Sequence, residues 1–305
     1  MSANIHPSAP STPTPDTRHL EKSLRNKQSL FSFAMSAVVG MLTILALVPL
    51  FSVVLMLFYR GGKSLSFALF YELPPGPMQE GGGFGNAILG TVVMVGIAAA
   101  IAVPMGVLAA LFLAETAPDS RLAKTVRFCG KVLTGFPSIL AGVFAYGAVV
   151  LLTGGFSAVA GGVALSILML PTVMLTAEEA LRMVPLKMKE AAIGMGATDF
   201  QCVWMVLLPT SLPGILTGVM LAVARAAGET APLLFTALFS NYWISAGGNV
   251  ELMQPTASLA VLIYNFSGVP FQNQVELAWA AALVLVLLVL TVNLIGQAIS
   301  RRRID

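Results

Sequence analysis

Five long, strongly apolar stretches of this chain contain no charged residue, and they limit its possible folds more than any other feature of the sequence. The stretches cover residues 28–59, 81–114, 132–177, 200–224 and 277–300. A helix needs about 20 apolar residues to cross the hydrocarbon core of a membrane. Four stretches therefore predict one span each, and the 132–177 stretch predicts two because the Thr-Gly-Gly sequence at 153–155 can interrupt it. The predicted spans cover residues 33–58, 87–114, 132–152, 157–177, 206–227 and 277–298.

The composition supports a membrane protein. Hydrophobic residues make up 57 % of the 305-residue chain, and charged residues make up only 10 %. Ordinary soluble domains contain roughly 45–50 % and about 25 % of these two classes. So few charges could not cover the surface of a soluble protein of this size, and the apolar stretches lack the alternating pattern of β-barrel strands. The sequence therefore predicts an all-α integral membrane protein with six transmembrane helices.

Lysine and arginine are unevenly distributed between the two sides of the predicted bundle. Fourteen of the 17 fall in segments 18–27, 121–131, 182–189 and 301–303, which six spans place on one side. The other side has only Arg60 and Lys63. Because the side rich in Lys and Arg stays in the cytoplasm, both termini are predicted to be cytoplasmic. We expect residues 1–30 to form a disordered tail and residues 31–60 to form an uncleaved first transmembrane helix.

The polar segments between the spans are predicted to be loops. Residues 60–85 and 230–276 are punctuated by Gly and Pro and fall on the outer side. Within the second loop, residues 258–266 are apolar but too short to span, which predicts a re-entrant or interfacial helix. On the cytoplasmic side, Glu115 and the charges that follow it are predicted to form a solvated surface.

Side chains that could perform chemistry in the membrane are missing from the predicted spans. The only histidines, His6 and His19, fall in the polar tail, and Cys129 and Cys202 both fall on the cytoplasmic side, where a disulfide is not expected. The Gly-Lys-Ser sequence at 62–64 resembles the end of a phosphate-binding P-loop but lacks its first glycine. We therefore predict no catalytic residue, no metal site and no cofactor bound by this chain. Work driven by ATP would need an ATPase on another chain.

The cytoplasmic segment 178–209 joins the fourth and fifth spans. It predicts a short helix that is broken at Gly194 and Gly196, followed by a second element that enters a span near Pro209. The two alanines at 191–192 would offer a smooth surface on which the backbone of another protein could approach closely. An exposed loop of this kind suits docking into a groove of a partner.

This segment resembles the EAA motif of ABC importer permeases. The matching residues are Glu190, Ala191, Ala192, Gly196, Leu208 and Pro209, with Val206 where the family usually has Ile. The flanking segments 136–139, 170–171, 176–181 and 224–237 resemble the phosphate-specific branch of that family. The resemblance covers most of residues 85–300 and implies a type I (MetI-like) permease domain there, with a coupling loop at about 178–209.

The resemblance also implies a function and a set of partners. It implies a permease subunit in the bacterial inner membrane that forms half of the pathway of an ATP-driven importer for inorganic phosphate. The expected partners are a PstC-like permease, two PstB-like ATPases and a PstS-like external phosphate-binding protein, with ATP and Mg used by the ATPases. Residues 190–196 would then be the coupling helix that sits in a groove of the ATPase.

Other functions stay open at this stage. A permease for sulfate, molybdate or phosphonate would share the docking loop and differ in its pore residues. An ion channel would not need the loop. A gradient-driven carrier commonly contains an inverted repeat, and the sequence shows no convincing one.

Arg225 and Glu229 form a charged pair within the region of the fifth span. Their spacing of four residues places them on one helix face, and each would cost about 2.5–3.5 kcal/mol at the bilayer centre. Counted from Pro209, Arg225 lies roughly 24 Å along the helix, in the outer half of the membrane. Two interpretations remain. Arg225 attracts phosphate while Glu229 holds or releases it, or the pair orders the helix or a partner contact.

Overall fold

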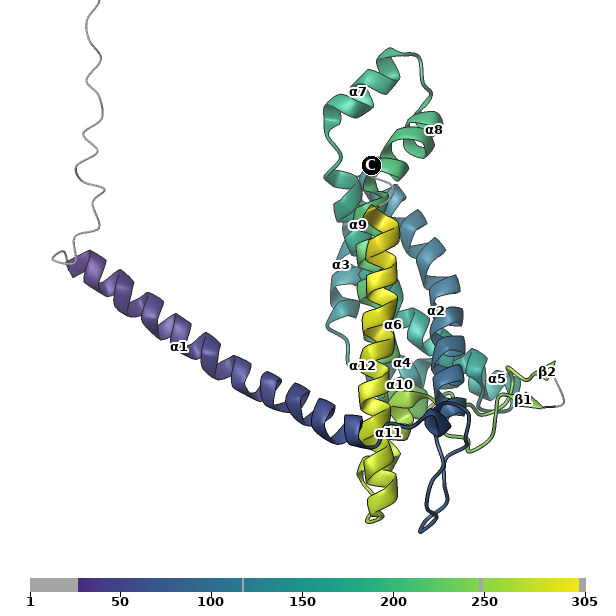
Figure 1. The fold of residues 1–305 in the computed structure, drawn as a ribbon. Helices are drawn as coiled ribbons and strands as arrows, with labels where there is room; N and C mark the ends of the chain where they lie inside the picture. Colours follow the sequence, from purple (N-terminus) through teal and green to yellow (C-terminus); the bar gives the residue numbers. More distant parts are fainter. Residues whose placement is uncertain (1–26, 117, 247–248, 302–305) are drawn as a thin grey trace, which may run out of the picture. The chain divides into compact units, whose positions relative to one another are not determined.

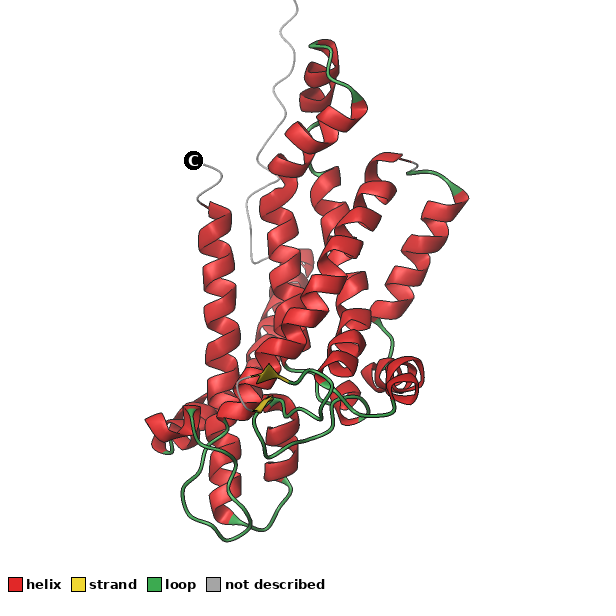
Figure 2. Ribbon diagram, turned by 90° about the vertical axis from the view of Figure 1, so that its right-hand side faces the viewer, coloured by secondary structure: helices red, strands yellow, loops and turns green. Residues whose placement is uncertain are grey.

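The computed structural model describes residues 27–116, 118–246 and 249–301, which are helical apart from loops and one short hairpin (Figures 1 and 2). The chain divides into two compact units, residues 1–55 and 56–305, and each is described by itself. The predicted tail at 1–30, with His6 and His19, lies almost wholly outside the described residues. In the first unit, α1 (Lys27–Met56) is apolar along nearly its whole length, as expected for a helix that crosses a membrane.

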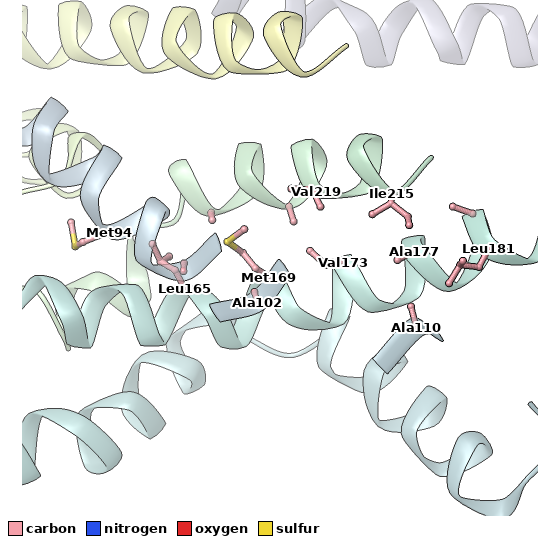
Figure 3. Packing of buried hydrophobic residues seen from close by; sticks show 14 of the residues in the cluster. Met94, Ala102, Ala110, Leu165, Met169, Val173, Ala177, Leu181, Ile215 and Val219 are labelled. Carbon is pink, nitrogen blue, oxygen red and sulfur yellow. The ribbon is translucent and has the colours of Figure 1, made fainter. Parts of the chain in front are cut away.

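The second unit is built around α6, which is the most buried of the long helices. It packs against α2 and α9, and α12 packs against α9. The bounds of these helices are α2 Gly85–Leu111, with a π-helical extension η4 Phe112–Thr116, α6 Ala158–Arg182, α9 Leu208–Ala227 and α12 Gln272–Arg301. Figure 3 shows Met94 of α2, Leu165 and Val173 of α6, and Ile215 and Val219 of α9 in the shared apolar core.

Small residues allow these helices to approach one another closely. A methyl group at Gly218 of α9 would overlap the side chain of Thr176 in α6, and one at Gly162 of α6 would lie 2.5 Å from Ile97 of α2. Lipid tails are as apolar as the side chains of the helices, so the hydrophobic effect does not drive membrane helices together. They associate largely through such close packing instead. The glycines therefore fix α6 between its two neighbours.

Five of the six predicted spans correspond to long apolar helices of the structure. The main differences are at their ends. The predicted fourth span stops at 177, whereas α6 continues to Arg182 because the first charge of that region, Glu178, is buried and paired rather than solvated. The helix that contains the fifth span begins at Asp199 rather than near 206.

The third predicted span, 132–152, is wrong as a single straight helix. The structure has α3 (Arg121–Thr134) and, after a bend of 106°, a second helical segment, Ser138–Thr153. That segment comprises α4 Ser138–Ala145, a π-helical turn η5 Tyr146–Val150 and α5 Leu151–Thr153. The break falls at Gly135–Pro137, where the backbone of Pro137 is extended and its nitrogen has no hydrogen to donate to a helix. The predicted interruption at 153–155 is confirmed, with Gly154 in a left-handed conformation.

Short elements close the bundle at the end opposite to α7 and α8 (Figure 1). They are η3 Phe67–Phe70, α10 Ala231–Leu234, the antiparallel strands β1 Ser245–Ala246 and β2 Asn249–Val250, and α11 Leu259–Ser267. The predicted short helix at 258–266 is confirmed as α11, which packs on α12. Its start is fixed twice, since the Ser258 hydroxyl accepts from the Val261 N–H and the Thr91 hydroxyl accepts from the Leu259 N–H.

Candidate functional site

The segment between α6 and α9 projects from one end of the bundle (Figure 1). It contains α7 (Leu186–Gly194) and α8 (Asp199–Cys202). Beyond the end of α7, the Ala197 N–H donates to the Ala192 carbonyl at 3.1 Å, and the Gly196 N–H donates to the Ile193 carbonyl at 2.9 Å. These two bonds form a Schellman motif, in which the residue just beyond the helix end adopts a left-handed conformation. Here that residue is Gly196, with φ +88°. The glycine therefore makes the sharp reversal after α7 possible.

The residues of the EAA-like motif divide between the surface and the interior of the projecting segment. Glu190 and Ala191 are exposed. Ala192 is only 3 % exposed and belongs to the same buried cluster as Cys202 and Leu207. Of the two alanines, only Ala191 offers surface to another protein, because Ala192 faces inward in the turn between α7 and the helix that follows.

Large apolar side chains gather on the outside of the projecting segment. We call this set the loop apolar surface; its members are Leu186, Met188, Ile193, Met195, Phe200, Trp204 and Met205. Met195 is 84 % exposed, and the rings of Phe200 and Trp204 lie against each other with centroids 5.9 Å apart. Large apolar side chains exposed in this number on one short segment are typical of a surface that is covered by a partner.

The second half of the segment runs without interruption into α9. Thr198 and Gln201 form a reciprocal capping box at the start of α8, and a π-helical turn, η6 (Val203–Leu207), joins α8 to α9. Leu208 is half-buried and Pro209 is exposed in the first turn of α9. The helix already begins at Asp199, ten residues before Pro209, so this proline does not mark its start. The π-helical turn η6 just before Pro209 accommodates the missing N–H of the proline.

An ion pair holds the projecting segment against the bundle. Lys189 of α7 pairs with Glu115 of η4, and the lysine and glutamate side chains are 33 % and 17 % exposed. The predicted solvated surface around Glu115 is therefore wrong for this residue. The two residues are 74 positions apart, so no local sequence pattern indicates that they meet.

A second charged cluster joins α3, η4 and α6 just below the projecting segment. Glu178, whose side chain is 7 % exposed, accepts from Arg127 Nε at 2.5 Å and pairs with Arg182 at 2.9 Å. Arg127 also donates to the backbone carbonyls of Leu113 at 2.8 Å and Pro118 at 3.0 Å. The contact with Leu113 satisfies a carbonyl near the end of a helix, where no N–H of the helix is left to bond. Sequence reasoning missed this cluster, although a carboxylate at the end of an apolar helix with Arg four residues later is a usable signal.

The structure brings Arg225 and Glu229 together at the other end of α9. Arg225 Nε lies 3.5 Å from Glu229 Oε1, and the side chains are 42 % and 17 % exposed. The helix ends at Ala227, so Glu229 already belongs to the following turn. The contact is therefore longer and more open than the pairs beside the projecting segment.

A family model described as the binding-protein-dependent transport system inner membrane component matches residues 102–305. The matched part contains α3 to α12, including the projecting segment and the Arg225–Glu229 pair. The chain belongs to this family of ABC permeases. It is a multi-pass inner-membrane protein, and the resemblance drawn from its loop is confirmed.

Similar proteins place this permease within the PstA group. The phosphate transport system permease protein PstA of Yersinia pestis is 40 % identical over 244 residues, which are 80 % of this chain and 81 % of the relative. The probable PstA of Methanocaldococcus jannaschii is 34 % identical over 276 residues, 87 % of this chain and 91 % of the relative.

Solved structures support the fold of the permease. The MetNI methionine ABC transporter in an inward-facing form matches with a TM-score of 0.56 and 23 % identity, covering 72 % of this chain and 93 % of that chain. A bacterial alginate ABC transporter matches with a TM-score of 0.61 and 16 % identity, covering 92 % and 98 %. Both likenesses show the type I permease architecture that the loop resemblance implies.

Proposed function

We propose that this chain is the permease subunit of an ATP-driven importer for inorganic phosphate and forms half of its translocation pathway. The observation that carries the proposal is the identity of about two residues in five with PstA permeases across four fifths of the chain. A permease for another oxyanion is the second candidate, because the projecting segment would look the same in both. The chain itself performs no catalysis in this proposal.

The projecting segment is the coupling element of the proposal. Residues 190–196, together with the loop apolar surface, would sit in a groove of a PstB-like ATPase, one of two, which binds ATP and Mg. Leu208 and Pro209 would carry the movement into α9. The closed turn at Gly196 supports this role because a rigid turn transmits a push that a flexible loop would absorb.

The charged contacts beside the segment give the movement a path into the bundle. The Lys189–Glu115 pair connects α7 with the end of α2, and Glu178 connects α6 with α3 through Arg127. A displacement of α7 would therefore be transmitted to α2, α3 and α6 together. A PstC-like permease would supply the other half of the pathway.

The sidedness of the chain follows from the same proposal. The coupling segment and both termini would be cytoplasmic, as the distribution of Lys and Arg predicts. The opposite end, with α10, α11 and the hairpin, would then face a PstS-like binding protein. Arg225 lies at that end of α9, where it would attract an arriving phosphate, with Glu229 as its partner when the pathway is closed.

Reconstitution of the complete complex in vesicles tests the proposed function. The binding protein is loaded in turn with phosphate, sulfate and molybdate, and ATP hydrolysis and labelled uptake are measured in parallel. We expect both to be stimulated by phosphate alone. Stimulation by another oxyanion would mean that this ion, and not phosphate, is the substrate. Flux without ATP would mean that the protein is a channel and not an importer.

A further inference from the structure

A cavity of about 590 Å³ opens at the end of the second unit away from α7 and α8. One wall comes from the π-helical turn η2 (Leu57–Gly61) and the residues after it, and the other comes from the first two turns of α12. Gly81 and Gly82 lie along its edge. The cavity is distinct from the coupling segment and from the Arg225–Glu229 pair, neither of which lines it.

Close packing between the two walls builds this cavity. Gly61 lies so near to α12 that a Cβ there would come within 2.7 Å of the Trp279 carbonyl oxygen and 2.9 Å of Leu283. This contact sets Arg60, the preceding residue, directly over the Trp279 ring, with the guanidinium carbon 5.4 Å from the ring centroid. A guanidinium in this position is stabilised by the face of the indole. The N–H groups of Arg60 remain available to a ligand, because the indole ring does not form the paired hydrogen bonds that a carboxylate would form with them.

The charge of the cavity is positive. Arg60 and Lys63 are the only basic residues between the first two apolar stretches, and both line it. Within the described ranges, neither forms an ion pair. Among the described residues of the wall, Glu276 is the one acidic residue, and it accepts from the Gln272 side chain at 3.0 Å. The described lining therefore holds two cations and one carboxylate, and the nearby Glu72 carboxylate is engaged by the Gly82 N–H at 3.1 Å.

We propose that this cavity binds a phosphate group, with Arg60 and Lys63 as its principal ligands. A guanidinium donates paired N–H groups to phosphate oxygens, and an ammonium adds a compact charge. The Ser64 hydroxyl, also on the wall, supplies a further donor. The phosphate belongs either to a free inorganic ion or to the headgroup of a phospholipid. Tyr59 and Trp279 border the site, and these residue types gather at the level of lipid headgroups.

Binding by the purified full-length chain in a maltoside detergent tests the site without any measurement of transport. Labelled inorganic phosphate is titrated by equilibrium dialysis, and dioleoyl phosphatidylglycerol is titrated by native mass spectrometry, with dioleoylglycerol as the lipid that lacks phosphate. The test variant is Arg60→Gln with Lys63→Gln. The matched control is Lys124→Gln with Lys131→Gln, which removes the same charge from exposed positions of α3.

We expect wild-type chain and control to bind at least one phosphate probe, and the test variant to bind it at least tenfold more weakly. Exchanging the cations, Arg60→Lys with Lys63→Arg, should retain most of the binding, which separates lost charge from a folding defect. Binding of phosphatidylglycerol alone identifies a lipid site, and binding of inorganic phosphate alone identifies an ion site. The proposal is overturned if neither probe binds, if dioleoylglycerol binds equally well, or if both double variants lose binding to the same extent.

Discussion

The two ends of the permease use their charged residues differently. Beside the projecting segment, Glu178 is buried and pairs with two arginines at 2.5 and 2.9 Å, while Lys189 and Glu115 pair across helices. At the other end, Arg225 and Glu229 are 3.5 Å apart, and the cations of the cavity form no ion pair with any carboxylate in the described part of the chain. Charges that are fully paired connect helices, whereas charges that are loosely paired stay available to a ligand. Under the proposed function, the closely paired end has the mechanical role and the loosely paired end has the binding role.

The largest effect on stability is expected from Glu178→Gln. Removing this carboxylate charge leaves Arg127 largely buried without its partner, which costs about 3 kcal/mol or more at such sites. Thermal unfolding of the purified chain in detergent should show a markedly lower midpoint. Glu179→Gln is the matched control, because Glu179 is exposed and surface changes usually stay within about 0.5 kcal/mol. Equal midpoints for the two variants would mean that the cluster does not hold α3 to α6.

A smaller effect is expected from Gly196→Ala. The residue has φ +88°, and an alanine in the left-handed region costs about 1–2 kcal/mol. We expect faster hydrogen exchange in α7 and weaker stimulation of ATP hydrolysis by the loaded binding protein. Gly194→Ala provides the control, since Gly194 lies within α7 with nothing near its missing side chain, so alanine there should leave both measurements unchanged or stabilise the helix slightly. If hydrogen exchange in α7 of the Gly196→Ala variant matched that of the wild type, the turn would not require a glycine at this position.

The pair of Lys189 and Glu115 should contribute less, because both side chains are partly exposed and such pairs are worth about 0.5–1 kcal/mol. Lys189→Glu alone should lower the amount of phosphate taken up per ATP hydrolysed, since it places two carboxylates together. Adding Glu115→Lys should restore the ratio. Failure of the reversed pair to rescue uptake would remove this contact from the proposed path between α7 and α2.

The apolar helices and the turn at Gly196 could be predicted from the sequence because their signals are local. A run without charge defines a span, and Gly196 lies where the chain must reverse. The bent third segment could not be predicted in the same way, since α3 carries Arg121 and Arg127 and was therefore assigned to a loop. Arg127 tolerates that position because it meets Glu178, 51 residues later. Partners so far apart along the chain become visible only when the helices are packed together.

The smallest effect on stability is expected from Arg225→Gln, and this variant sharpens the comparison most. A pair 3.5 Å apart with one side chain 42 % exposed contributes about 0.5 kcal/mol or less, so the complex should assemble and unfold as the wild type does. Uptake of labelled phosphate should nevertheless be abolished if Arg225 draws the anion into the pathway. Glu229→Gln frees the arginine and should leave assembly intact while changing the dependence of uptake on phosphate concentration. Loss of assembly in either variant, measured by copurification of the partner permease, would instead show that the pair orders a helix end or a subunit contact, and the binding role would then rest on other residues at that end.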